Sequence, residues 1–313
     1  MKTRCTANTM LLIVTIFWGF SYLFMKMGLN SLQEYNLIAL RFGIAFFLAA
    51  AIFPMRLLKA NIKTIRYAFV LGSILFLVFT CITFGIKFTS TSNAAFLVSL
   101  TVIFVPILTA LIVKKVPETN VIVGVIFALL GVGLLTLNSR LMINFGDLLC
   151  VAGALFYATH IIVTERLTKT VDSITLGVMQ LGFAGALGFI FSLLFEAPIF
   201  PITAGEWLPI LVLSILCSAI GFIVQTVAQQ HTTSTNTGLI FSLEPVFAAI
   251  FGFLFLDEIL SVQGWIGALF VLFGVIHSQV NWGAIFTQDL HYTRLIHYLH
   301  QINKTTFSTN KTK

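Results

Sequence analysis

Charged residues are scarce in this chain of 313 residues. Asp, Glu, Lys and Arg together make up 9% of the sequence, whereas hydrophobic residues make up 58% and the mean hydropathy is +1.01. Soluble domains contain roughly 25% charged residues, so the composition excludes an ordinary soluble domain and indicates an integral membrane protein. At about 20 residues per membrane helix, the apolar material suffices for roughly ten spans.

Motifs of enzymes are also missing. The sequence has no G-x-x-x-x-G-K-[ST], so no internal ATPase drives transport, and it has no H-E-x-x-H or G-x-S-x-G. The cysteines form no C-x-x-C pair, and we interpret them as reduced packing residues: Cys5, Cys81, Cys150 and Cys217. We therefore expect no enzymatic activity, no catalytic residue, no metal site and no cofactor. The net charge of +7 comes without an aromatic-interleaved basic patch, so we expect no nucleic-acid partner.

Long apolar runs, separated by polar residues, proline or glycine, predict ten membrane helices in an all-α protein. The first run follows Lys2 and Arg4, but it is too long for the apolar region of a signal peptide, so we expect it to be retained. A polar tail covers 282–313, and a short surface helix or a disordered segment both fit it. The predicted spans are 8–28, 36–54, 67–87, 93–113, 119–138, 146–165, 173–195, 207–229, 235–256 and 262–281.

The basic residues predict the orientation of these spans. With the N-terminus inside, most lysines and arginines fall in cytoplasmic segments, including the clusters at 56–66 and 114–115. The opposite side has Lys87 and Arg140 in its loops, and its longest loop, 196–206, has two acids and no base. Cytoplasmic loops of membrane proteins are enriched in lysine and arginine. We therefore expect a multi-pass protein of the cell membrane with both termini in the cytoplasm.

The chain also repeats itself. Laying the second half over the first places Ser242-Leu243 on Ser99-Leu100 and Gly267 on Gly124, and a slightly shorter offset near the start of each half places Gly182 on Gly43. We call this pairing of positions the repeat alignment. Two repeats, 8–138 and 146–281, would each contain five helices. Because five is odd, the repeats must have opposite orientations, which is the inverted-repeat design of many secondary transporters, with a binding site near the midplane.

One acid, Glu244, lies inside an apolar run, and Pro245 follows it. A charge at bilayer depth costs about 2.5–3.5 kcal/mol on insertion scales, and the proline leaves the carbonyl of Phe241 without its helical donor. Two interpretations follow: Glu244 borders a polar pathway, which we favour, or it pairs with a buried base and stabilises packing. Pro106 in the first half and Pro245 in the second are predicted helix breaks, although ordinary bends in membrane helices also contain proline.

Arg41 and four aromatic or imidazole side chains are further candidates for substrate or coupling contacts. Arg41 would bind a substrate carboxylate or Glu244, and the alternative is that it reaches the outer headgroups. Trp18 with Tyr22, and Tyr157 with His160, lie three or four residues apart on similar helix faces. These side chains would line a cavity and stack on a substrate, and the alternative is that they serve packing. His160 would relay protons, and the alternative is that it makes a local hydrogen bond.

Two glutamines, Gln225 and Gln229, lie one helical turn apart in the eighth predicted span. They would contact a polar solute or bridge helices.

Several of these stretches resemble the EamA repeat of the drug/metabolite transporter superfamily. The carriers of the resemblance are Ala228–Asn236 followed by Ser242–Phe247, Gly85–Ala95 with Val105-Pro106, Trp18-Gly19 and Leu40-Arg41-Phe42. The resemblance covers roughly 8–281. It implies ten helices in an inverted five-plus-five repeat and alternating access to a central cavity. Members move amino acids, other small metabolites or drugs, often outward. Asp257 precedes Glu258 where members often have glycine.

The resulting hypothesis is a secondary transporter that exports small polar or amphipathic metabolites, such as amino acids. Its partners would be a small-molecule substrate and the lipid bilayer, and a homodimer stays open. The alternative is a non-transporting membrane sensor or assembly factor. The short cytoplasmic loops count against a signalling role.

Overall fold

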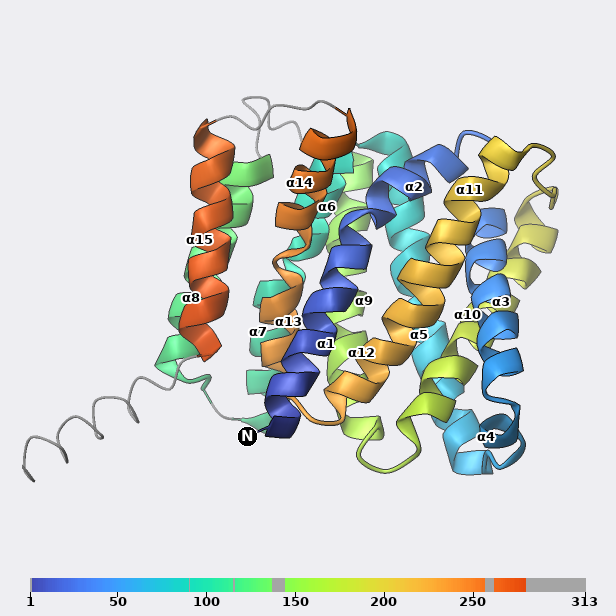
Figure 1. The fold of residues 1–313 in the computed structure, drawn as a ribbon, viewed down its shortest axis with the longest axis horizontal. Coiled ribbons are helices and arrows are strands. Elements are labelled where there is room, and N and C mark those ends of the chain that lie inside the picture. Colours follow the sequence, from blue (N-terminus) through green and yellow to red (C-terminus); the bar gives the residue numbers. More distant parts are fainter. Residues whose placement is uncertain (1, 90, 115, 137–143, 257–261, 280–313) are drawn as a thin grey trace, which may run out of the picture.

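A computed structural model describes residues 2–89, 91–114, 116–136, 144–256 and 262–279. Asp257, Glu258 and the tail 282–313 lie outside the described residues, as do the last residues of the predicted spans 119–138 and 262–281. In the described part every regular element is a helix (Figure 1). The helices of the first half are α1 Lys2–Gly19, α2 Ser21–Gly28, α3 Glu34–Ile52, α4 Pro54–Leu58, α5 Ile62–Phe88, α6 Thr91–Ser99, α7 Thr101–Val113 and α8 Thr119–Thr136.

The second half begins with the capping box of Asn144 and Asp147, in which each side chain accepts a hydrogen bond from the other residue's backbone N–H at the start of α9. Its helices are α9 Phe145–Leu167, α10 Ser173–Phe195, α11 Ala204–Val212, the π-helix η1 Leu213–Ile220, α12 Gly221–Gln229, α13 Ser234–Phe241, α14 Glu244–Leu256 and α15 Val262–Gln279.

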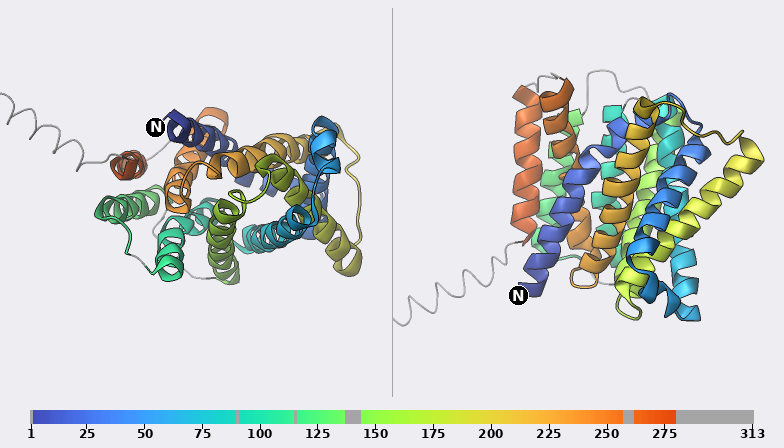
Figure 2. Two further views of the ribbon diagram at one scale, coloured as in Figure 1. Left: turned by 90° about the horizontal axis from the view of Figure 1, so that it is seen from below. Right: turned by 45° about the vertical axis from the view of Figure 1, so that its right-hand side comes forward.

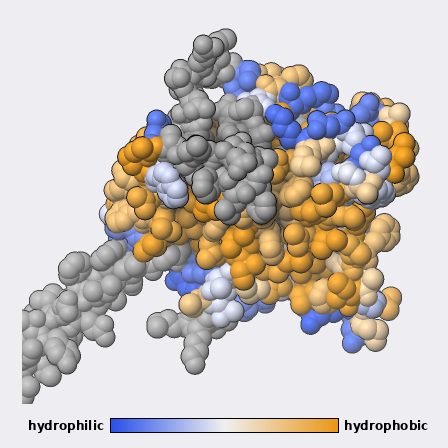
Figure 3. All heavy atoms as spheres, turned by 45° about the horizontal axis from the view of Figure 1, so that its top comes forward, coloured by the Kyte–Doolittle hydropathy of each residue, from blue (hydrophilic) through white to orange (hydrophobic). Residues whose placement is uncertain are grey.

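Among the described residues, seven helical segments are long and apolar enough to cross a membrane, and two shorter apolar helices cover 119–134 and 262–278. Many large hydrophobic side chains on their outer faces are exposed, such as Phe47 and Leu111. Hydrophobic residues cover the middle of the face in Figure 3, and hydrophilic residues gather toward its upper and lower rims. An apolar belt between polar rims is the surface that a bilayer requires.

Several predicted spans are interrupted. The first divides at Phe20, the fourth at Leu100 and the ninth at Ser242 and Leu243. The repeat alignment relates Leu100 to Leu243, so both halves divide at the same place in the repeat. Pro106 lies within α7, after the division at Leu100. Pro245 lies in the first turn of α14. Backbone N–H groups in a first turn have no acceptor within the helix, so proline loses no helical hydrogen bond there.

Glycines bring two pairs of helices, α8–α15 and α3–α10, into close contact. These pairs lie at opposite ends of the elongated bundle in the left-hand view of Figure 2, which looks along the helices from below. In the α8–α15 pair, a Cβ atom built on Gly131 would lie 2.5 Å from the carbonyl oxygen of Gly267. In the α3–α10 pair, a Cβ atom on Gly185 would lie 2.7 Å from the backbone nitrogen of Gly43. Glycine at positions 131 and 185 permits these approaches, as is common between membrane helices.

Candidate functional site

A cavity of about 30 Å³ lies near the helix divisions of α1–α2 and α13–α14. This volume holds one or two water molecules. The cavity is lined by side chains of both halves of the chain: Trp18, Ser21, Tyr22, Met25, Arg41, Val78, Phe79, Ile82, Val98, Tyr157, Phe222 and Glu244. The structure thus brings together Glu244, Arg41, Trp18, Tyr22 and Tyr157, five of the eight predicted contact residues.

Arg41 on α3 is the cation of this cavity and is 1% exposed. Its Nε atom donates a hydrogen bond to Ser218 Oγ at 2.7 Å, and its guanidinium lies 4.2 Å from the centre of the Phe79 ring. The two terminal nitrogens, Nη1 and Nη2, have no hydrogen-bond partner within the described structure. Burying a charge is costly unless it is paired and hydrogen-bonded, so these two nitrogens lack partners that a buried guanidinium ordinarily has.

Glu244 supplies the acid from the first position of α14. Among the described residues, the ion pairs with N···O distances up to 4.0 Å are Arg56–Asp172, Lys87–Glu34 and Lys169–Glu165. Arg41 and Glu244 line one cavity and do not form an ion pair within that distance, so both side chains border the same small space.

Aromatic rings form much of the cavity wall. The Trp18 ring lies 4.8 Å from Phe241, 5.1 Å from Phe222 and 5.9 Å from Tyr157, measured between centroids. Its indole N–H donates to the carbonyl oxygen of Cys217 at 2.8 Å.

The π-helix makes this indole contact available. The Gly221 N–H donates to the carbonyls of Leu216 and Ser218, which leaves the Cys217 carbonyl for the indole. A Cβ atom on Gly221 would lie 2.8 Å from the Trp18 ring nitrogen, so glycine is needed there. Short π-helical segments inside α-helices are frequent at functional sites.

The other three predicted contact residues lie beside the cavity, outside its lining. The His160 ring stacks on Tyr157 with 6.1 Å between centroids, and its Nε2 atom lies 2.9 Å from Gln180 Oε1. Gln225 donates to Gln229 Oε1 at 2.9 Å, and Gln229 donates to the carbonyl of Ile161 at 3.0 Å. The structure therefore places these side chains in hydrogen bonds within and between helices.

Ser218 and Phe79 are cavity-side residues that our sequence analysis missed. Nothing in the sequence distinguishes Ser218 from other serines in apolar runs. Phe79 carried a usable signal, because the repeat alignment places it on Phe222, and both rings line the cavity.

Two larger depressions, each of about 480 Å³, have fewer polar groups that are available to bind a ligand. The first lies between α7 and α8, includes Pro106, and has Lys114 as its one charged lining residue. The second includes Glu34, Lys87 and Glu196, but Glu34 already pairs with Lys87 at 2.6 Å. Glu196 already accepts from the backbone nitrogens of Tyr35 and Asn36, each at 2.8 Å. We therefore take the small central cavity as the candidate site.

Comparisons with known proteins agree with a transporter. The chain is 29% identical to an uncharacterised transporter of Archaeoglobus fulgidus over 87% of this chain and 85% of that protein. It is 28% identical to the uncharacterised transporter YyaM of Bacillus subtilis over 86% of this chain and 92% of that protein. A chain of known crystal structure superposes with a TM-score of 0.73 at 17% identity, covering 88% of this chain and 96% of that one, which shows the fold alone.

The model of one family matches this chain twice, at residues 6–137 and 144–278. The two matches together cover most of the sequence and include every residue of the candidate site. Because the family model matches most of the chain, and relatives are named as transporters, this chain belongs to the EamA-like transporter family, within the drug/metabolite transporter superfamily.

Proposed function

We propose that the protein is a secondary transporter of ten membrane spans, arranged as an inverted five-plus-five repeat in the cell membrane. It moves small polar or amphipathic metabolites, such as amino acids, out of the cytoplasm by alternating access to the central cavity. Both termini lie in the cytoplasm. The repeats cover 8–138 and 146–281.

Contacts at one end of the bundle support the inverted repeat. The repeat alignment relates Gly124 to Gly267 and Gly131 to Gly274. A Cβ atom on Gly124 would lie 2.7 Å from the Gly274 carbonyl oxygen, and one on Gly131 would lie 2.5 Å from that of Gly267. Exchanging the halves turns one contact into the other, as two oppositely directed copies around a two-fold axis require.

The α3–α10 pair behaves in the same way. The repeat alignment relates Gly43 to Gly182 and Phe46 to Gly185. A Cβ atom on Gly185 would meet the Gly43 nitrogen at 2.7 Å, and one on Gly182 would meet the Phe46 ring at 2.8 Å. Symmetric contacts at both ends support a two-fold axis between them, and inverted-repeat transporters bind their substrates near such an axis.

The orientation proposal is supported by the distribution of charge. In Figure 1 the N-terminus and α4, which carries Arg56, lie on the same side of the molecule. Arg56 pairs there with Asp172 at 2.8 Å. Membrane proteins keep the side richest in lysine and arginine in the cytoplasm.

One observation carries the transport proposal: the two unpaired terminal nitrogens of buried Arg41 face a cavity that also contains Glu244. A guanidinium binds a carboxylate through two parallel hydrogen bonds, and a carboxylate binds an ammonium group. Aromatic rings complete a surface that suits an amphipathic solute. The cavity volume fits a closed state, so a solute would enter when the halves separate.

The test begins with purified protein in detergent, screened by thermal shift against a metabolite library. A solute that stabilises the protein in a saturable manner, and that also exchanges across reconstituted vesicles, supports transport. Glu244→Gln should then reduce exchange while membrane insertion is retained. The matched control is Glu206→Gln, because Glu206 is an acid that caps α11 at the surface.

Unchanged exchange in Glu244→Gln would remove Glu244 from the mechanism. A protein that no metabolite stabilises, and that exchanges none of them, would instead favour the non-transporting sensor or assembly factor.

A further inference from the structure

A buried band of polar side chains runs between α9 and α12, next to the central cavity. We call this band the polar seam and define it by Tyr157, His160 and Thr164 on α9 with Gln225, Thr226 and Gln229 on α12. All six are buried. Gln180 on α10 joins the seam, because it contacts His160 and donates to Thr226 Oγ1 at 3.0 Å.

The polar seam has fewer hydrogen bonds than its groups require. Eight buried side-chain nitrogen or oxygen atoms in the described structure have no partner, and four belong to the seam. These four are Tyr157 Oη, His160 Nδ1, Thr164 Oγ1 and Gln225 Oε1. Buried polar atoms are nearly always hydrogen-bonded, and the exceptions need an explanation. A second conformation in which water reaches these atoms would satisfy them.

The corresponding place in the first half is different. The repeat alignment relates Gln225 to Ile82 and Thr164 to Met25. Ile82 and Met25 line the central cavity, whereas Gln225 and Thr164 do not. The cavity thus extends between α2 and α5 in the first half and ends at Tyr157 and Phe222, where the polar seam begins. The seam, in the second half, is therefore packed more tightly than the corresponding place in the first half.

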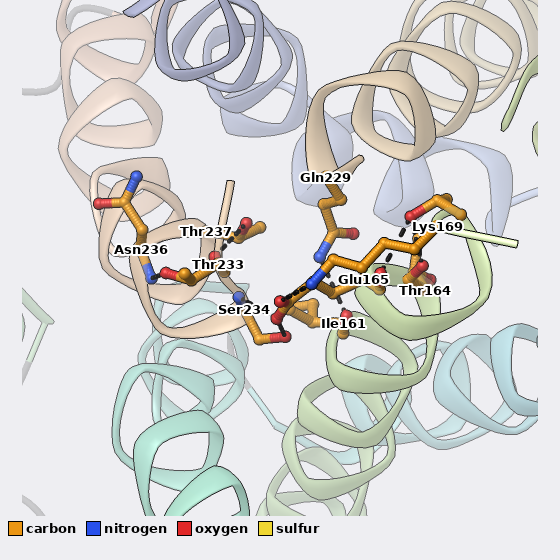
Figure 4. A network of polar contacts seen from close by, with 10 residues as sticks. Ile161, Thr164, Glu165, Lys169, Gln229, Thr233, Ser234, Asn236 and Thr237 are labelled. Atoms are coloured by element: carbon orange, nitrogen blue, oxygen red, sulfur yellow. Dashed lines mark hydrogen bonds and ion pairs between the residues drawn. The ribbon is translucent and has the colours of Figure 1, made fainter. Parts of the chain in front are cut away.

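A carboxylate holds the far end of the seam together. Glu165 on α9 accepts hydrogen bonds from the backbone nitrogen of Ser234, at 2.7 Å, and from the Ser234 hydroxyl. Ser234 is the first residue of α13, so the contact places a negative charge at a helix N-terminus. Lys169 pairs with the same carboxylate at 2.7 Å. Figure 4 shows Glu165 between Lys169 and the start of α13, with Gln229 alongside.

We propose that the polar seam is the closed half of the solute path and that the Glu165–Ser234 contact is the positioning contact that keeps it closed. Hydroxyl, amide and imidazole groups line this half, so the path suits hydrated, hydrogen-bonding solutes and disfavours purely apolar compounds. The assignment to a solute path rests on the proposed transport function. Opening separates α12 and α13 from α9 and lets water reach the four unpartnered atoms.

This mechanism makes the Glu165–Ser234 contact specific to the closed state. Removing a contact that exists in one state only shifts the population toward the other. Loss of Glu165 therefore increases exposure of the seam to water, even when no solute is present. A purely structural role for Glu165 predicts a lower melting temperature without selective exposure of the seam.

The experiment measures water access directly in the full chain, reconstituted in proteoliposomes. A reporter cysteine is introduced as Thr164→Cys, and exposed Cys5 is replaced by serine, with the Thr164 parent providing the background from the other cysteines. The probe is a charged methanethiosulfonate reagent. We expect slow labelling in the reporter chain and labelling faster by about tenfold after Glu165→Ala, a typical size for conformational coupling.

Two variants calibrate the result. Ser234→Ala removes one donor and leaves the backbone donor, so it should give a smaller increase and should fold even where Glu165→Ala does not. Glu196→Gln is the matched control. Like Glu165, Glu196 accepts hydrogen bonds at the start of a helix that belongs to another span, and its two donors are backbone nitrogens at 2.8 Å each. This control contact joins α10 to α3, away from the seam, and its loss should leave labelling unchanged.

Equal labelling with and without Glu165, or equal acceleration by Glu196→Gln, would overturn the proposal. So would exchange of a solute across the vesicles with no labelling of the reporter in any variant. Labelling that responds to Glu165 in a protein that transports none of the screened solutes would support the opening of the seam and count against the transport function.

Discussion

Arg41 and Ser218 connect α3 to the π-helix through a hydrogen bond of 2.7 Å from Nε to Oγ. This bond uses the guanidinium nitrogen nearest the backbone and leaves the other two for the cavity. The guanidinium carbon also lies 4.2 Å from the centre of the Phe79 ring, where a cation–π interaction stabilises the charge. The hydrogen bond and the ring contact together fix the position of the Arg41 guanidinium.

Arg41→Lys should weaken binding of a carboxylate solute by roughly tenfold or more, because an ammonium group cannot make the two parallel hydrogen bonds of a guanidinium. Titration of the stabilising solute by thermal shift would give the change in Kd. Arg56→Lys is the control, since Arg56 is a half-exposed surface partner of Asp172. Equal weakening in both variants would count against a binding role for Arg41.

Ser218→Ala should lower the free energy of unfolding by about 1–3 kcal/mol, the usual penalty for a buried donor left without its partner. It should also reduce solute affinity, because the guanidinium loses its fixed direction. Chemical denaturation in detergent checks the first effect and solute titration the second. Unchanged stability together with unchanged affinity would show that the Ser218 hydroxyl does not orient Arg41.

Gly131→Ala should destabilise the α8–α15 pair by about 1–3 kcal/mol, the usual range for overpacking. Its new Cβ atom would lie 2.5 Å from the Gly267 carbonyl oxygen, which is backbone and cannot move aside easily. Gly43→Ala is the control within a helix, because no neighbouring atom lies within 4 Å of a Cβ atom there. The melting temperature should fall for the first variant and hold or rise for the second. The reverse order would contradict this packing.

The carboxyl group of Asp172, which pairs with Arg56 on α4, should make the free energy of unfolding depend on pH. Partial burial raises the pKa of its carboxyl, but hydrogen bonds from Thr175 and the charge of Arg56 outweigh that effect, so the pKa lies below its ordinary value. A lowered folded-state pKa contributes stability above the unfolded-state value and loses it as pH falls through the folded-state value. Because the side chain is 45% exposed, the contribution should be below about 1 kcal/mol.

Asp172→Asn tests this prediction, since asparagine caps a helix about as well as aspartate. The stability advantage of the parent over the variant, measured by denaturation, should be constant near neutral pH and should shrink below about pH 4, where aspartate is usually protonated. An advantage that stays constant into strong acid would show that the charge of Asp172 contributes nothing.

Much of the site was readable from single features of the chain. Glu244 was predicted because an acid within an apolar run is rare, and Trp18, Tyr22 and Tyr157 because their spacing puts large rings on similar helix faces. The sequence predicted cavity contacts equally for His160, Gln225 and Gln229. The structure instead gives these three side chains hydrogen-bond partners beside the cavity. Residue type and period cannot distinguish a polar group that faces a cavity from one that faces a neighbouring helix.

By itself, the sequence determined that this chain is a helical membrane protein of repeated design, because hydropathy, charge and glycine spacing are properties of each segment alone. Only the tertiary structure decided which segments meet: that Arg41 donates a hydrogen bond to Ser218, that both repeats divide at Leu100 and Leu243, and that Glu165 reaches α13. Such contacts join residues far apart in the chain. They depend on the angles at which helices cross and on how closely glycines let them approach, and neither is encoded in any one segment.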